Sequence, residues 1–204
     1  MSRAGRILDR RPDDHYVTPR WAVEALLAGP LGIEEVRMTG DVLDPCAGSG
    51  AILKALGANS YKVRGIELDE QRAREVAAYA NCEQGDSLKT VSWGAPDAVV
   101  MNPPYLYALE FVTKALKVCH LDNPHTKVGG VVAVLLRLQW LSSQKRAAFH
   151  RDHPADILVL PRRPSFTMDA KTDAADYAWF VWGPGRGNRW AILNQCDVVV
   201  EDET

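Results

Sequence analysis

The chain has 204 residues, 47% of them hydrophobic, and a formal net charge of −2 at pH 7. These values predict one compact domain with a substantial core and give no overall attraction to a nucleic-acid backbone. No apolar run reaches the roughly 20 residues of a membrane-spanning helix, and the N-terminal residues lack the apolar segment of a secretory signal. We therefore expect a cytoplasmic protein with no membrane partner.

Strands and helices alternate along most of the chain. The predicted elements are a helix at about 21–27, a strand at 40–44, a helix at 51–56, a strand at 61–66, a helix at 71–80, a third short element that ends at 85, a strand at 97–101, a helix at 106–118 and a strand at 129–136. This alternation predicts an α/β fold with a parallel, doubly wound sheet, which binds ligands at the carboxyl ends of its strands.

The last third of the chain predicts a helix at about 142–150 and then two strands, 156–160 and 177–182, that can pair as a hairpin. Residues 190–193 can add an edge strand, and residues 201–204 form an acidic end that we expect to be solvated. The sequence contains no internal repeat and no low-complexity linker.

Metal binding is not predicted. His150 and His153 lie close together but lack partner ligands of suitable spacing, and the cysteines include no C-x-x-C pair. We expect reduced, packed thiols at the four scattered positions Cys46, Cys82, Cys119 and Cys196.

A glycine-containing loop joins the strand at 40–44 to the following helix, and its sequence is Asp44, Pro45, Cys46, Ala47, Gly48, Ser49, Gly50. Glycines let the backbone approach a ligand closely, and the start of a helix offers free N–H groups. The loop lacks the third glycine of the dinucleotide fingerprint, and Asp44 would repel a pyrophosphate. A cofactor with a cationic centre is therefore favoured, and a nicotinamide-dependent oxidoreductase is the least favoured alternative.

Two further acids follow successive predicted strands. Glu67 has nearly the spacing expected of a ribose-binding acid, and Asp86 can accept a hydrogen bond from the amine of an adenine ring. Each acid alone is also explained as a helix cap or a turn residue. Together with Asp44, they favour a cofactor site along one edge of the sheet.

The sequence Asn102-Pro103-Pro104-Tyr105 follows the apolar strand at 97–101. The Asn102 side-chain oxygen and the Pro103 carbonyl can both accept hydrogen bonds from one planar NH2 group, while the prolines add no competing N–H donor. Tyr105 can stack on the group that carries the amine. The pattern also occurs as an ordinary turn, but in this context it predicts amine recognition.

These motifs, in this order, resemble class I S-adenosylmethionine-dependent methyltransferases that act on exocyclic amines, most closely the N6-adenine DNA methyltransferases, including small phage-type enzymes. The resemblance covers most of the chain. It implies a Rossmann-like sheet of seven strands, the last antiparallel, with helices on both faces. It also implies a single domain over residues 1–204, in which residues 1–20 form an N-terminal arm. Within that arm, Tyr16-Val17-Thr18-Pro19 resembles the element that closes over the methionine part of the cofactor.

The resemblance assigns the catalytic motif to Asn102, Pro103, Pro104 and Tyr105. The cofactor-binding residues that it implies are Tyr16, Thr18, Pro19, Asp44, Pro45, Cys46, Ala47, Gly48, Ser49, Gly50, Glu67, Leu68, Asp86, Ser87 and Asn102.

The implied reaction is direct methyl transfer to an adenine that has left its base stack. Asn102 and the Pro103 carbonyl would accept the N6 hydrogens, and Tyr105 would stack on the base. In the loop 161–166, Arg162 and Arg163 could hold phosphates and Phe166 could cover the second face of the base. The alternative is that the arginines are exposed turn residues and Phe166 belongs to the core.

A DNA substrate needs local positive charge, for which the arginines at 3, 6, 10 and 11 and the cations at 137, 145, 146 and 151 are candidates. No insertion large enough for a separate target-recognition domain is present, so specificity would come from short loops such as 121–128, from a homodimer or from a partner. An RNA base or a protein glutamine remains an alternative substrate, and a non-catalytic nucleic-acid-binding module is a less favoured alternative.

Overall fold

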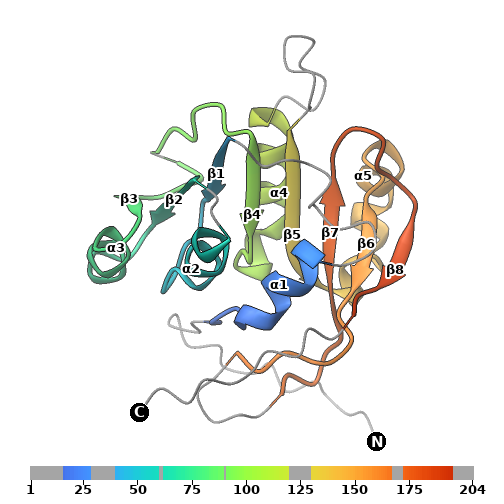
Figure 1. Ribbon diagram of the computed structural model, residues 1–204. Coiled ribbons are helices and arrows are strands. Elements are labelled where there is room, and N and C mark those ends of the chain that lie inside the picture. The colour runs from blue at the N-terminus through green and yellow to red at the C-terminus, as the bar shows by residue number, and fades with distance from the viewer. Residues whose placement is uncertain are drawn as a thin grey trace, which may run out of the picture.

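The computed structural model describes residues 16–28, 40–59, 62–89, 91–119, 130–166 and 172–194. Within these ranges a central sheet of eight strands has the order β3-β2-β1-β4-β5-β7-β6-β8, and helices lie on both of its faces (Figure 1). The strands are β1 Asp41–Asp44, β2 Lys62–Glu67, β3 Asn81–Gln84, β4 Ala98–Met101, β5 Val131–Arg137, β6 Asp156–Val159, β7 Tyr177–Trp182 and β8 Trp190–Ile192.

The helices follow the predicted alternation. They are α1 Arg20–Ala28, α2 Ala51–Ala58, α3 Glu70–Ala77, α4 Ala108–Val118 and α5 Ala147–Asp152, with short 3-10 turns η2 Tyr105–Tyr107, η3 Leu138–Trp140 and η4 Gln144–Arg146. The helix expected at 106–118 begins at 108, because the chain leaving the two prolines first forms η2. Its Tyr107 N–H donates to the Pro104 carbonyl at 2.9 Å.

The sheet is parallel from β3 through β5, and β7 runs antiparallel to both of its neighbours, β5 and β6. The predicted doubly wound sheet and the predicted pairing of 156–160 with 177–182 are therefore confirmed. The tail also adds an edge strand, since β8 pairs in parallel with β6 and extends the expected seven strands to eight. The strand order reverses between β1 and β4, which is the position where open α/β sheets bind their ligands.

The central strands bury both of their faces. In β4, Ala98 and Val100 pack in one core cluster with α1 and α2, whereas Val99 and Met101 pack in a second cluster with α4. Side chains alternate between the faces of a strand, so a strand covered on both faces has a continuous apolar sequence. This is why residues 98–101 contain no polar side chain.

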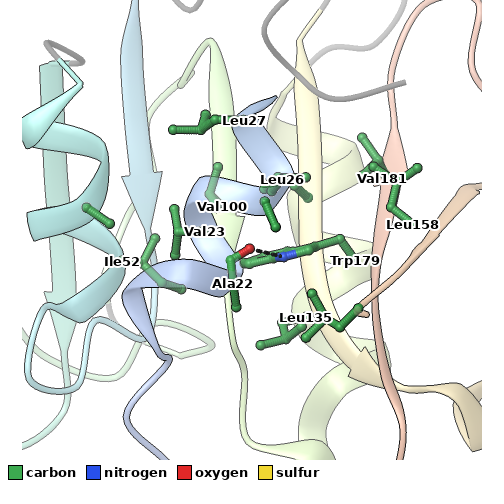
Figure 2. Packing of buried hydrophobic residues seen from close by; sticks show 14 of the residues in the cluster. Ala22, Val23, Leu26, Leu27, Ile52, Val100, Leu135, Leu158, Trp179 and Val181 are labelled. Carbon is green, nitrogen blue, oxygen red and sulfur yellow. Dashed lines mark hydrogen bonds between the residues drawn. The ribbon is translucent and has the colours of Figure 1, made fainter. Parts of the chain in front are cut away.

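Helix α1 is fixed to the sheet by one hydrogen bond within an apolar contact. The buried Trp179 indole N–H of β7 donates to the Ala22 carbonyl of α1 at 2.8 Å, and Val23 and Leu26 pack around it (Figure 2). A buried indole N–H without a partner would lose the free energy of that bond and of its desolvation. The contact therefore stabilises α1 and the segment that leads into it, residues 16–19, beside the carboxyl ends of β1 and β4.

Candidate functional site

A cavity of about 650 Å³ lies where β1, β2 and β4 end. The structure brings most of the predicted site residues to its walls: Tyr16, Thr18, Asp44, Pro45, Cys46, Ala47, Gly48, Ser49, Glu67, Leu68, Asp86, Ser87, Asn102, Pro103, Pro104 and Tyr105. Pro19 and Gly50 do not line it, and neither do Arg162, Arg163 and Phe166. The three parallel strands end at the same edge of the sheet, which explains why residues so far apart in sequence meet here.

The loop after β1 turns sharply into α2. Gly50 has a φ of 73°, in the left-handed region, and a Cβ placed there would lie 1.8 Å from the Tyr79 hydroxyl oxygen. Glycine is favoured at this position because it adopts the left-handed backbone without strain. The Gly48 N–H donates to Glu67 Oε2 at 2.7 Å, so the loop is tied to the end of β2.

Asp44 is a buried carboxyl group at the end of β1, with 1% of its surface exposed. Burial raises its pKa to about 7, against hydrogen bonds from the Cys46 N–H and thiol that lower it, and the nearby charge of Glu67 raises it further. A cation placed beside Asp44 would reverse this effect, because an opposite charge favours the ionised form. The carboxyl group is therefore suited to a ligand that carries positive charge.

Cys46 connects Asp44 to the turn at residues 102–105. Its N–H donates to Asp44 Oδ1 at 3.1 Å, its thiol lies 3.6 Å from the same oxygen, and the Asn102 N–H donates to its sulfur. Burial raises the pKa of the thiol well above its ordinary value, which keeps it neutral. Cys46 is consequently a packing and hydrogen-bonding residue of the site.

Glu67 is 7% exposed and is held in one orientation by its neighbours. Oε2 accepts the Gly48 N–H, and Oε1 accepts the Asp69 N–H at 2.9 Å and lies 3.4 Å from Arg72 Nε. Arg72 also lines the cavity but was missed in the sequence, where it reads as a surface residue of α3. Its position five residues after an acid at a strand end is the only sequence signal for this ion pair.

Asp86 lies on the loop after β3, and its carboxylate accepts the N–H groups of Leu88 and Lys89 at 2.9 and 3.2 Å. Burial opposes its ionisation, but the hydrogen bonds from Lys89 and Leu88 lower its pKa below the ordinary value. The hydroxyl of the next residue, Ser87, donates to the Pro45 carbonyl, and the backbone carbonyl of Ser87 accepts the Trp93 indole N–H at 2.9 Å. The two loops that flank this part of the cavity are thus bonded to each other.

Both ends of the Asn102 side-chain amide form hydrogen bonds. Its Nδ2 donates to Thr18 Oγ1 at 3.0 Å, and the Tyr105 hydroxyl donates to its Oδ1 at 3.3 Å. Pro103 is buried and Pro104 is exposed. Because proline has no backbone N–H, these two residues contribute carbonyl acceptors and no donors. The arrangement presents an oriented acceptor group at the wall of the cavity.

Aromatic side chains pack against Tyr105, the last residue of this turn. The Tyr105 ring centroid lies 5.8 Å from that of Tyr16 and 6.0 Å from that of Tyr177, and the Arg137 guanidinium lies 5.1 Å from the Tyr105 centroid. Arg137 in turn bonds to the Tyr177 hydroxyl and to Asp173, both at 2.9 Å. The Tyr105 ring is therefore held by neighbours on several sides.

The other predicted substrate contacts have structural partners. Phe166 is 4% exposed and packs edge-on against Tyr16 at 5.3 Å, while Arg162 lies over the Trp21 ring at 4.6 Å. Arg163 is exposed and pairs with Asp176 at 2.8 Å. These contacts correspond to the alternative in which Phe166 belongs to the core and the arginines lie on the surface.

The cavity mouth also carries apolar residues that the sequence argument passed over. Leu106 is 77% exposed and Tyr107 49% exposed, and both line the cavity directly after the turn 102–105. Their place next to the predicted motif could have revealed them. The N-terminal arginines and the loop 121–128, proposed as substrate contacts, lie outside the described residues.

A model of one protein family matches residues 4–135, which include the loop 44–50, Glu67, Asp86 and the turn 102–105. The chain belongs to the uncharacterised methyltransferase family DUF6094. No curated protein matches the chain.

Solved structures place this DUF6094 protein in the fold of class I methyltransferases. A protein from Listeria monocytogenes, assigned as a class I S-adenosylmethionine-dependent methyltransferase, aligns with a TM-score of 0.59 and 14% identity over 91% of this chain and 68% of that one. A protein from Pyrococcus horikoshii, assigned as an RNA methyltransferase, gives 0.59 and 17% over 79% and 83%. A type I restriction modification subunit from Vibrio vulnificus gives 0.59 and 17% over 86% and 45%. The predicted fold class is confirmed.

The part of the chain that the structure describes contains neither a candidate membrane span nor a candidate metal site. None of its helices has the length and apolar character needed to cross a bilayer. Within the same residues, no three histidine, cysteine or acidic side chains converge in a way that could hold a metal ion.

Proposed function

We propose that this DUF6094 protein transfers a methyl group from S-adenosylmethionine to the exocyclic N6 amine of adenine in DNA. The observation that carries the proposal is the Asn102 amide, fixed by Thr18 and Tyr105 at the wall of a cavity that also contains Asp44, Glu67 and Asp86. The membership of a methyltransferase family and the class I fold support the reaction type.

The residues present fit this cofactor. The cavity volume of about 650 Å³ lies within the range of small-molecule sites. Glu67 would hold the ribose and Asp86 the adenine amine, while Asp44 at the end of β1 also lines the cavity. When bound, S-adenosylmethionine supplies a methyl group on a cationic sulfur, and Asp44 is the buried group whose ionisation that charge would favour.

The catalytic turn would hold the amine that receives the methyl group. Asn102 Oδ1 and the Pro103 carbonyl accept the two amine hydrogens, which keeps the nitrogen lone pair out of conjugation with the ring. The Tyr105 ring packs against the base plane. These groups act by orientation and by fixed dipoles, so no covalent bond to the protein is needed.

A nucleic-acid base is favoured as the substrate by the exposed apolar residues that line the cavity. Leu106 and Tyr107 provide an exposed apolar and aromatic surface where the neighbours of an extruded base would lie. The Vibrio neighbour is a modification subunit of a restriction enzyme, whereas the Pyrococcus neighbour is assigned to RNA. An RNA base amine or a protein glutamine would present the same NH2 group and is the alternative that the experiment below separates.

We further propose that the chain acts as one domain in the cytoplasm of a bacterium or of a phage-infected host. The thiols Cys46, Cys82 and Cys119 are free, as expected in a reducing compartment. A homodimer would enlarge the DNA-contacting surface, and light scattering with and without a DNA oligonucleotide measures that state.

The test supplies the purified protein with methyl-labelled S-adenosylmethionine and, separately, double-stranded DNA, single-stranded DNA, total RNA and a protein extract. Digestion and mass spectrometry then identify the labelled product. Labelled N6-methyldeoxyadenosine that disappears with Asn102→Ala is the expected result. Label only in RNA or protein would overturn the DNA assignment and retain the amine chemistry.

A further inference from the structure

Thr18 and Asn102 are 84 positions apart in the sequence, yet their side chains form a direct hydrogen bond of 3.0 Å. Thr18 is 4% exposed. The bond is partly buried at the wall of the cavity, and it connects the segment 16–19 to the turn 102–105.

This bond restricts rotation of the Asn102 amide at the wall of the cavity. An asparagine amide has an acceptor end and a donor end, and its terminal torsion is broadly distributed unless neighbours fix it. With Nδ2 bonded to Thr18, Oδ1 lies on the side of Tyr105, whose hydroxyl occupies only one of its two lone-pair positions. A reversed amide would direct N–H donors at an amine that also donates.

Thr18 is itself held on both sides. The Val17 N–H donates to the Phe166 carbonyl at 3.3 Å, and the Pro19 carbonyl accepts the Ala22 N–H at 3.0 Å, at the start of α1. The same Ala22 accepts the Trp179 indole N–H, which fixes α1 to the sheet (Figure 2). The hydroxyl of Thr18 thus has a position set by the core.

We propose that Thr18 is a positioning residue for methyl transfer, whose hydroxyl oxygen orients the Asn102 amide so that Oδ1 accepts the substrate amine. This goes beyond a cofactor-closing role for the segment 16–19. It rests on the proposed function, in which Asn102 holds the amine.

The test compares Thr18→Val, which keeps the shape and removes the acceptor, with Thr18→Ser, which keeps the acceptor. With Thr18→Val we expect kcat at saturating cofactor to fall roughly 10- to 100-fold, as for a misplaced catalytic group. The dissociation constant for S-adenosylmethionine should change less than about threefold, and Thr18→Ser should recover most of kcat. A Thr18→Val enzyme with unchanged kcat and weakened cofactor binding would overturn the proposal, because Thr18 would then be a cofactor contact.

A second measurement does not depend on the substrate. In 15N-labelled protein without cofactor, the side-chain NH2 resonances of Asn102, assigned with Asn102→Asp, should shift in Thr18→Val and remain near their wild-type positions in Thr18→Ser. Identical spectra for wild type and Thr18→Val would exclude the bond. Failure of the proposed function differs from this, since the wild-type protein would then label no nucleic acid while the NMR shift persisted.

Discussion

Asp44→Asn tests whether the buried carboxyl group at the end of β1 is kept for the ligand at the expense of stability. Asn retains an oxygen for the Cys46 N–H, which lies 3.1 Å from Asp44 Oδ1, and it removes a charge from a site that is 1% exposed. The perturbation therefore isolates the cost of ionising this group in the folded protein without cofactor.

The expected change in the free energy of unfolding follows from the pKa of Asp44, which burial raises from 3.8 to about 7. The native protein binds this proton more tightly than the unfolded chain, so the wild-type free energy of unfolding falls as the pH rises from about 4 to 7. One pKa unit corresponds to about 1.4 kcal/mol, which gives a total loss of about 4 kcal/mol. Linkage assigns about 2.5 kcal/mol of this loss to the interval from about pH 5 to pH 8.5.

Urea denaturation of cofactor-free wild type and Asp44→Asn at pH 5 and pH 8.5 measures the difference directly. The advantage of the variant should grow by about 2.5 kcal/mol between these values, or by roughly 5 to 10 °C in Tm. Comparing the two proteins at each pH cancels the titration of the groups that do not interact with Asp44. A difference that stays constant with pH would refute the reasoning, because Asp44 would then have the same pKa in both states.

Three further predictions concern the site. Asn102→Ala should lower kcat at least about 100-fold while isothermal titration gives an unchanged affinity for S-adenosylmethionine, and a variant with wild-type turnover would exclude the amine-binding role. Affinity for S-adenosylmethionine should weaken as the pH falls below about 7, because Asp44 must lose its proton to interact with the sulfonium. The product S-adenosylhomocysteine, whose sulfur is neutral, should show no such dependence. Dissociation constants of the two ligands that change in parallel with pH would contradict this prediction. Leu106→Ala should weaken binding of an adenine-containing duplex roughly fivefold or more in a fluorescence anisotropy titration. The control Leu141→Ala removes an exposed leucine that does not line the cavity and should leave binding unchanged. Equal effects of the two variants would exclude Leu106 as a DNA contact.

Much of the sheet could be predicted because its central strands have continuous apolar sequences. The run at 98–101 identified β4, and the acids Asp44 and Glu67 marked the ends of β1 and β2, so the location of the cavity followed from the alternation of strands and helices. The loops could be placed because glycine and proline restrict the backbone locally.

The contacts that tune the site could not be predicted, because they join residues distant in sequence. Nothing in the sequence around Thr18 specifies a bond to Asn102, and the raised pKa of Asp44 depends on how completely the folded chain covers it. Phe166 illustrates the same limit. An aromatic residue in a loop beside cations fits a base-stacking role, yet its 4% exposure results from three-dimensional packing against Tyr16 and Tyr177.

The bond between Trp179 and Ala22 also bears on how the protein is synthesised. It spans 157 positions, so a ribosome has translated the cofactor loop, the acids and the catalytic turn long before β7 emerges. Until then α1 lacks its hydrogen bond to the sheet strand β7. A nascent chain or a prematurely terminated product that carries every predicted motif therefore still lacks this contact between α1 and β7.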